Sequence, residues 1–188
     1  MTPLTCMRRL VPLLAAFLMI SCGDPSVSYC KKVADINAEY SEKSDALAER
    51  LLNPTLPGLE ESSRQAAKIL KDRDEDLADL STRDVDPDLV AFVEEDRKLF
   101  ARGRELAEHY QQYFEKYLKG GPELTPDPVR AASKIGRGRQ EVRKILNAAR
   151  TLEERAENLR KEKSTAYGTE LPPLHFRLPD MKELLSNR

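Results

Sequence analysis

The chain contains no tryptophan, only two histidines and only three cysteines among its 188 residues, and aromatic residues make up 6% of it. Charged residues, by contrast, make up 34%. This composition is typical of long helices and coiled coils rather than of an enzyme built around a large core. No CxxC, CxxCH or cysteine–histidine metal spacing occurs. Two histidines, with Met181 as the only methionine beyond residue 21, also argue against a haem or copper site.

Catalytic motifs are missing as well. No glycine-rich phosphate loop follows a strand, and no spacing of serine, histidine and aspartate supports a triad. The di-iron sites of helical bundles use Glu-x-x-His, and His109 has no glutamate three residues before it. The acidic run 72–76 does not fit an EF-hand, because the sixth and twelfth positions counted from Asp72 are Leu77 and Arg83 instead of glycine and glutamate. We therefore predict no enzymatic activity, no cofactor and no metal.

Apolar residues recur at three- and four-residue steps over four segments, which is the stripe of an amphipathic helix. The segments are 28–52, 59–82, 87–119 and 125–167, and proline and glycine mark the short connections between them. No stretch has the alternation of a strand. We predict an all-α fold, an antiparallel up-down bundle of four helical segments; the alternative is a three-helix core with a loosely packed first helix. Gly136 and Gly138 predict a kink or break in the last segment.

The longest apolar run, residues 10–20, follows Arg8 and Arg9. Because about 20 apolar residues are needed to span a bilayer, this run is too short to cross one. A basic start, a short apolar run and a small residue before the cleavage point are the features of a secretory signal peptide. The sequence therefore predicts that the chain is exported.

The run ends in Met-Ile-Ser-Cys at positions 19–22, which resembles the lipobox of bacterial lipoproteins. The resemblance covers residues 1–22 only. It implies that residues 1–21 are a signal peptide and that Cys22 carries a diacylglyceryl thioether and an amide-linked acyl chain such as palmitate. The alternative is a signal peptide without lipidation, which would leave Cys22 and Cys30 as ordinary thiols in an oxidising compartment.

This resemblance further implies a bacterial cell-envelope protein, anchored to a membrane through Cys22 and facing the periplasm or the exterior. In proteobacterial lipoproteins an aspartate directly after the lipidated cysteine is an inner-membrane retention signal, so Gly23 favours the outer membrane. The predicted organisation is a signal peptide (1–21), a lipidated tether (22–29), a bundle domain (30–168) and a proline-containing tail (169–188). We expect the tail to be extended and partly mobile, and to lie across the bundle through Leu174, Phe176 and Leu178.

Charge is balanced overall but unevenly distributed. The net charge is −1, which argues against nucleic-acid binding. Eleven acids lie between positions 72 and 96, and six bases lie between positions 130 and 144. In an up-down bundle the acids would lie at the end near Cys22 and the bases at the far end. That far end suits an envelope protein partner or a cell-wall polymer; the alternative is solvated helix faces with local ion pairs.

Aromatic and basic residues come together around the third connection, where they predict a partner-binding site. The alternative is that the aromatic residues are core. The candidate residues are Tyr110, Tyr113, Phe114, Tyr117, Arg130, Lys134, Arg137 and Arg139. The favoured function is an interaction or scaffolding module, and the alternative is a ligand-binding or inhibitory bundle with its pocket at this site.

Two charged residues interrupt the apolar stripes of neighbouring segments. Arg73 lies in the second stripe and Asp96 in the third. Because an isolated buried charge is costly, we predict that they form a structural ion pair. Cys30 is predicted to be a small buried residue, with an intermolecular disulfide as the alternative.

Overall fold

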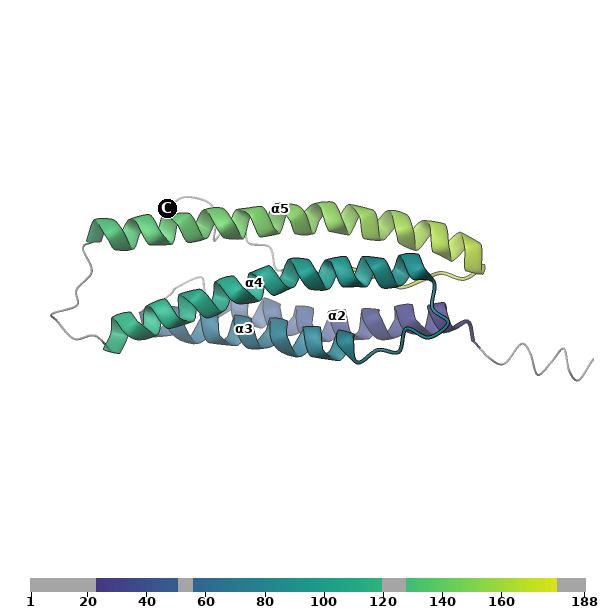
Figure 1. The fold of residues 1–188 in the computed structure, drawn as a ribbon, viewed down its shortest axis with the longest axis horizontal. Helices are drawn as coiled ribbons and strands as arrows, with labels where there is room; N and C mark the ends of the chain where they lie inside the picture. The colour runs from purple at the N-terminus through teal and green to yellow at the C-terminus, as the bar shows by residue number, and fades with distance from the viewer. Residues whose placement is uncertain (1–22, 51–55, 120–127, 179–188) are drawn as a thin grey trace, which may run out of the picture.

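The computed structural model describes residues 23–50, 56–119 and 128–178, which form four helices and an extended C-terminal segment. Helix α2 spans Pro25–Arg50, α3 spans Leu56–Ala78, α4 spans Pro87–Lys119 and α5 spans Pro128–Tyr167. No strand occurs in these three ranges. Successive helices run in opposite directions (Figure 1), which confirms the predicted all-α up-down bundle.

Aspartate followed by proline begins two of the helices. The Asp24 carboxylate accepts a hydrogen bond from the Ser26 backbone N–H at 2.8 Å, and the Asp86 carboxylate accepts one from the Asp88 backbone N–H at 2.9 Å. Each aspartate is therefore an N-cap, and the proline after it occupies the first helical position, where no N–H is needed. These local sequences determine the residues at which α2 and α4 begin. Both starts lie at the same end of the bundle (Figure 1).

The local sequence also determines where α5 ends. Gly168 has a φ of +62°, which glycine adopts without steric cost. The Thr169 N–H donates to the Ser164 carbonyl at 3.1 Å and the Gly168 N–H to the Thr165 carbonyl at 3.3 Å. This is a Schellman motif, and it turns the chain sharply back along the bundle.

The tether predicted for residues 22–29 is wrong beyond Asp24. Helix α2 already begins at Pro25, and Ser26 and Tyr29 are only 4% and 5% exposed. The prediction failed because the N-cap and proline signal was assigned to a linker. Only Gly23 and Asp24 therefore separate Cys22 from the bundle.

Helices α3 and α5 also depart from prediction. Pro57 and Gly58, predicted to lie in the connection, fall in the first turn of α3, and α3 ends at Ala78 instead of position 82. Proline is compatible with a first helical turn because the backbone N–H groups there have no intrahelical partner. The predicted break at Gly136 and Gly138 is absent, and α5 is continuous through both positions.

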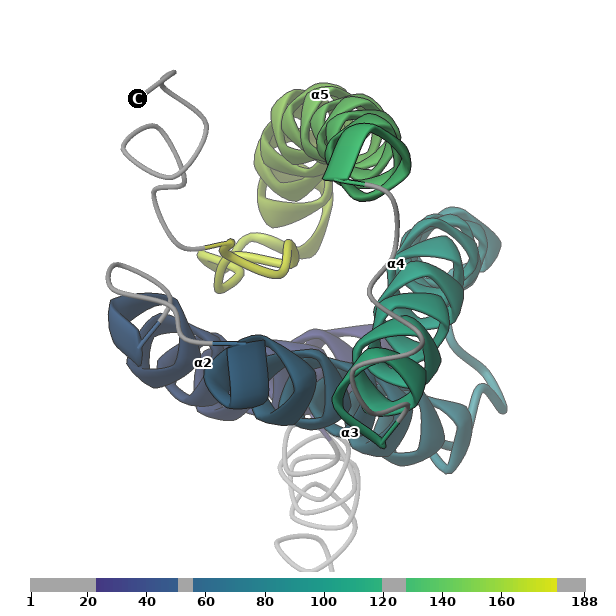
Figure 2. The ribbon, with the colours of Figure 1, turned by 90° about the vertical axis from the view of Figure 1, so that its left-hand side faces the viewer.

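The helices form an open arc instead of a closed square. Contacts are most extensive between α3 and α4, with α2 packed on α3 and α5 packed on α4, whereas α2 and α5 barely meet. The extended segment 169–178 lies between α2 and α5 (Figure 2) and contributes three nearly fully buried residues, Leu171, Leu174 and Phe176. The described part of the tail therefore completes the core, as the prediction that it lies across the bundle required.

Helix α2 is an integral part of this core. Its buried hydrophobic residues are Tyr29, Cys30, Val33, Tyr40 and Leu47. The alternative of a loosely packed first helix is therefore wrong. Cys30 is completely buried, and burial raises the pKa of its thiol to about 11. This buried, protonated thiol agrees with the prediction that Cys30 is a small buried residue. The thiol is not accessible to another molecule for an intermolecular disulfide.

A buried ion pair joins α3 to α4 at mid-bundle. Arg73 and Asp96 are 1% and 2% exposed, and the Arg73 guanidinium donates to the Asp96 carboxylate, which confirms the predicted pair. Burial raises the pKa of Asp96, and the guanidinium opposes this effect. The Arg73 Nε also donates to the Asn37 side-chain oxygen at 2.9 Å, and the Asn37 amide donates to the Leu174 carbonyl at 2.8 Å. One polar network therefore connects α4, α3, α2 and the tail.

Candidate functional site

The predicted aromatic–basic site is only partly accessible. Phe114 is 6% exposed and packs against Tyr110 and Tyr113, with ring centroids 6.0 and 5.5 Å apart, so it cannot belong to an exposed surface. Tyr110 and Tyr113 are half-buried, and Arg137 is exposed. The side chains of Tyr117, Arg130, Lys134 and Arg139 lie outside the described residues. The site thus remains a prediction, and Tyr110, Tyr113 and Arg137 are its described residues that have some exposed surface.

Tyr110 of α4 meets α5 at Gly138. A Cβ atom at Gly138 would overlap the Tyr110 ring, whereas a Cβ atom at Gly136 would meet nothing within 4 Å. Gly138 also contributes a backbone hydrogen bond to the Tyr110 hydroxyl, and burial raises the pKa of that hydroxyl. The two glycines of α5 therefore differ in role, and Gly138 permits the close approach of the tyrosine.

This difference predicts opposite effects for two matched substitutions. Gly138→Ala is expected to destabilise the protein because the new methyl group displaces the Tyr110 ring. Gly136→Ala is expected to stabilise it by up to about 1 kcal/mol, because alanine is the better helix former. Urea unfolding followed by far-UV circular dichroism compares them. Equal stabilisation by both substitutions would contradict the Tyr110–Gly138 contact.

The end of the bundle nearest residue 23 is closed by a polar clamp of Ser26, Asp86, Asp88, Lys163 and Tyr167. Lys163 is paired with the Asp86 and Asp88 carboxylates at 2.8 and 2.7 Å. The Tyr167 hydroxyl donates to Asp86 at 2.8 Å, and the Asp86 N–H donates to the Ser26 hydroxyl at 2.9 Å. The hydrogen bond from Lys163 is the main reason that the pKa of Asp86 falls to about 2. The clamp thus holds the ends of α2, α4 and α5 together.

The lowered pKa of Asp86 predicts acid sensitivity. Because the folded state favours the Asp86 carboxylate, its stabilisation is fully present above pH 4 and is lost as the pH falls through the folded pKa of about 2. The loss is expected to be about 1–2 kcal/mol in the free energy of unfolding. Asp86→Asn, which keeps an N-cap residue, should remove this component of the pH dependence.

The control for this experiment is Asp84→Asn. Asp84 lies two residues before Asp86, its side chain is 77% exposed, and its φ of 59° is one that asparagine also adopts. Unfolding by urea at several pH values between 5 and 2 compares the variants with the unsubstituted chain. If Asp86→Asn and Asp84→Asn retain the same pH dependence, the clamp does not stabilise the fold.

The acidic run 72–76 is used for pairing within the bundle. Asp74 pairs with Arg97 of α4 at 2.7 Å, Asp76 accepts a hydrogen bond from the Tyr40 hydroxyl of α2 at 2.6 Å, and Asp72 pairs with Lys68 at 2.6 Å. Within residues 23–50, 56–119 and 128–178, no three histidine, cysteine or acidic side chains gather as metal ligands. Asp74 and Asp76 therefore connect α3 to α4 and α2, whereas Asp72 pairs within α3.

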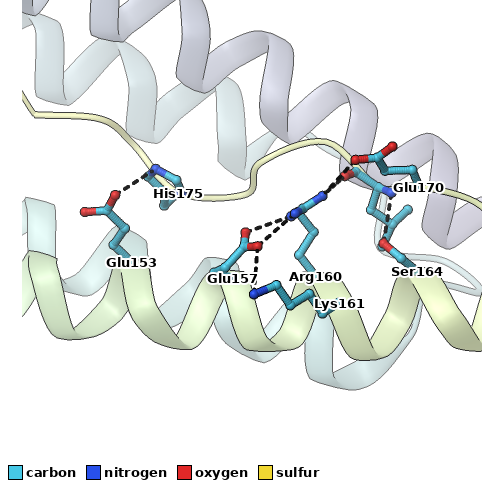
Figure 3. A network of polar contacts seen from close by, with 8 residues as sticks. Glu153, Glu157, Arg160, Lys161, Ser164, Glu170 and His175 are labelled. Carbon is cyan, nitrogen blue, oxygen red and sulfur yellow. Dashed lines mark hydrogen bonds and ion pairs between the residues drawn. The ribbon is translucent and has the colours of Figure 1, made fainter.

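The extended segment is bound to α5 through Arg160 (Figure 3). The Arg160 guanidinium lies between Glu157, at 2.8 Å, and the Leu171 carbonyl, to which it donates at 3.0 Å. The Leu171 N–H donates to the Ser164 hydroxyl at 3.0 Å, and further along the segment His175 lies 3.4 Å from Glu153. Backbone and side-chain groups of the tail are thus held at several points on one helix.

The same segment is bound to α2 on its other side. Besides the Asn37–Leu174 hydrogen bond, the Arg177 N–H donates to the Ser41 hydroxyl at 3.1 Å, and the Arg177 side chain pairs with Asp45 at 3.2 Å. The tail therefore replaces the missing contact between α2 and α5. Sequence reasoning found its apolar residues but not these polar positions on α2, because their partners are more than 100 residues away.

An apolar cavity of about 170 Å³ lies in the half of the bundle farther from residue 23. Every helix and the tail contribute to its wall, including Leu47 of α2, Leu70 of α3, Phe100 of α4, Ile145 of α5 and Leu178. No described side chain of the predicted aromatic–basic site lines it. Sequence analysis missed this cavity because its lining residues also fit an ordinary core stripe.

In the described part of the chain, no helix is both long enough and apolar enough to cross a bilayer. Comparison of the whole chain with protein-family models, curated proteins and solved structures finds no match.

Proposed function

We propose that this chain is a lipid-anchored protein of the bacterial cell envelope and that its helical bundle is an interaction or scaffolding module. The observation that carries the proposal is the N-terminal pattern: two arginines, a short apolar run and the Met-Ile-Ser-Cys ending at Cys22. More than one acyl chain on one cysteine would provide durable attachment, since each buried methylene contributes about 0.8 kcal/mol.

The position of α2 supports this proposal. Only Gly23 and Asp24 separate Cys22 from the first helical residue, so a lipid on Cys22 would hold the clamp end of the bundle at the bilayer surface. Helix α5 has 40 residues, which corresponds to about 60 Å at 1.5 Å per residue. The opposite end, with Arg137, would then be presented well away from the membrane to an envelope protein or a cell-wall polymer.

Metabolic labelling tests the anchor. Cells expressing the full-length chain take up an alkyne fatty acid, and the protein is isolated and detected by its alkyne. We expect label on the unsubstituted chain and on Cys30→Ala, the cysteine control, and none on Cys22→Ala. Label on Cys22→Ala would show that the lipidation site is wrong.

Site-specific crosslinking tests the interaction module. A photoreactive residue replaces exposed Arg137 on α5 or, as the control, exposed Lys31 on α2 near the clamp end. A discrete crosslinked envelope component from position 137 and none from position 31 is the expected result. Crosslinks of equal yield from both positions would contradict a partner at the far end.

A further inference from the structure

The cavity exists because small residues occupy positions where core stripes normally carry large ones. Ser44 and Ala48 of α2 and Ala66 of α3 all line it. Gly103 of α4 also lines it but has a different role, because a Cβ atom there would lie 3.3 Å from Leu70. Gly103 thus allows α3 and α4 to approach, while the other three residues leave the space open.

The wall of the cavity determines what it can hold. Among the residues that the structure describes, the wall contains no charged side chain, and Ser44 has its only side-chain hydroxyl group. A charged or strongly hydrated group inside would therefore lose its water without gaining partners. An enclosed apolar cavity of about 150 Å³ in another helical protein binds benzene. The space here has a similar volume, about 170 Å³, but is open to solvent on one side, so it suits a hydrocarbon group of about six to eight carbons whose other end projects outside.

The surrounding surface allows the polar end of such a molecule to stay outside. Leu106 and Ile145 line the cavity and also line a second groove between α4 and α5. The two spaces therefore share these two side chains as a common wall. The charged residues of this groove are Arg102, Glu105, Glu141 and Lys144, and Lys144 pairs with Glu141 at 2.7 Å. A molecule with its apolar end in the cavity could place its polar head group in this groove, where charged side chains of both signs are available.

We propose that this cavity binds the end of the alkyl chain of a free single-chain amphiphile, such as a fatty acid. The location excludes an acyl chain that stays in the bilayer. Ser44 lies 19 residues after the start of α2, about 28 Å along the helix from the end proposed to be anchored. The inference goes beyond the interaction module, and it requires lipidation neither for binding nor for its test.

The test uses the full-length chain with Cys22→Ser, exported without a lipid and purified without detergent, and decanoate as the probe. Methyl NMR is recorded during titration. We expect saturable shifts for Leu70, Leu106 and Ile145, which line the cavity, and none for Leu89 in the core at the clamp end. At about a hundredfold excess over Kd, the Tm should rise by several degrees. Shifts that are absent, unsaturable or equal at Leu89 would overturn the proposal.

Two substitutions on one helix provide the matched variant and control. Ala48→Leu places a larger side chain in the cavity and should abolish the shifts, whereas Ala46→Leu adds the same atoms at an exposed position and should preserve them. Ala66→Val, from α3, is the second filling variant if Ala48→Leu impairs folding. Retention of decanoate binding in a folded filling variant would overturn the proposal.

Two further measurements distinguish decanoate from other possible occupants of the cavity. If decanoate shifts appear only after residues 179–188 are deleted, the C-terminal segment of the chain is the occupant and the proposal is wrong. If phospholipid vesicles produce the shifts and free decanoate does not, the source is the bilayer and the proposal is also wrong. Shifts with decanoate in the undeleted chain support it.

Discussion

Asp96→Asn is expected to lower the free energy of unfolding by about 3–5 kcal/mol, because it leaves the Arg73 guanidinium buried without a counter-ion. Arg73 is 1% exposed, so water cannot replace the lost carboxylate. Its other neighbours are the Asn37 oxygen and the rings of Phe100 and Phe176, whose centroids lie 5.0 and 4.5 Å away. None of them carries a negative charge. Urea unfolding at pH 7, followed by far-UV circular dichroism, measures the loss.

The control is Asp74→Asn, at the residue of α3 that follows Arg73 and also pairs with α4. Asp74 pairs with Arg97 at 2.7 Å, but its side chain is 29% exposed, so the expected loss is below about 1 kcal/mol. The double variant Arg73→Met, Asp96→Leu should recover much of the stability, because a buried ion pair can be replaced by apolar residues. Recovery should be incomplete, since the Asn37 side-chain oxygen loses its hydrogen bond from Arg73. Equal losses for Asp96→Asn and Asp74→Asn would contradict the buried pair.

Helix α4 and the ion pair could be predicted because their signals are local. Asp86 followed by Pro87 defines the start of α4, and the apolar stripe continues to the glycines after Lys119. Arg73 and Asp96 each interrupt an apolar stripe. Because burying one charge without a counter-ion has a large desolvation free energy, the two residues are expected to pair. For these two features the prediction and the structure agree, whereas the same Asp-Pro signal at Asp24 and Pro25 was missed.

The contacts of the candidate sites could not be predicted because they depend on how helices are aligned. Gly138 faces Tyr110 only for the observed register of α5 against α4, and that register cannot be derived from either helix alone. Phe114 illustrates the same limit: its helical spacing was compatible with both core and surface. The cavity depends on the alignment of all four helices and the tail, so no single stretch contains its signal.

A second substitution with a large expected effect on the free energy of unfolding lies in the tail. Phe176→Ala is expected to cost about 3–5 kcal/mol of unfolding free energy, the range for removing a buried aromatic ring. Phe176 is 4% exposed and meets Phe100 edge to face, with ring centroids 5.0 Å apart. Its ring also covers the Arg73 guanidinium at 4.5 Å. The substitution therefore removes apolar contacts and opens the central ion pair to water.

The neighbouring residue is the matched control. Arg177 has a side chain that is 74% exposed and makes one ion pair with Asp45, so Arg177→Ala should cost less than about 1 kcal/mol. Urea unfolding compares the two variants, and limited proteolysis should cleave the tail earlier in Phe176→Ala alone. If both substitutions cost the same small amount, the tail rests on the bundle without contributing to its core. A large difference would mean that the gap between α2 and α5 is closed by this short extended segment, because no helix occupies that position.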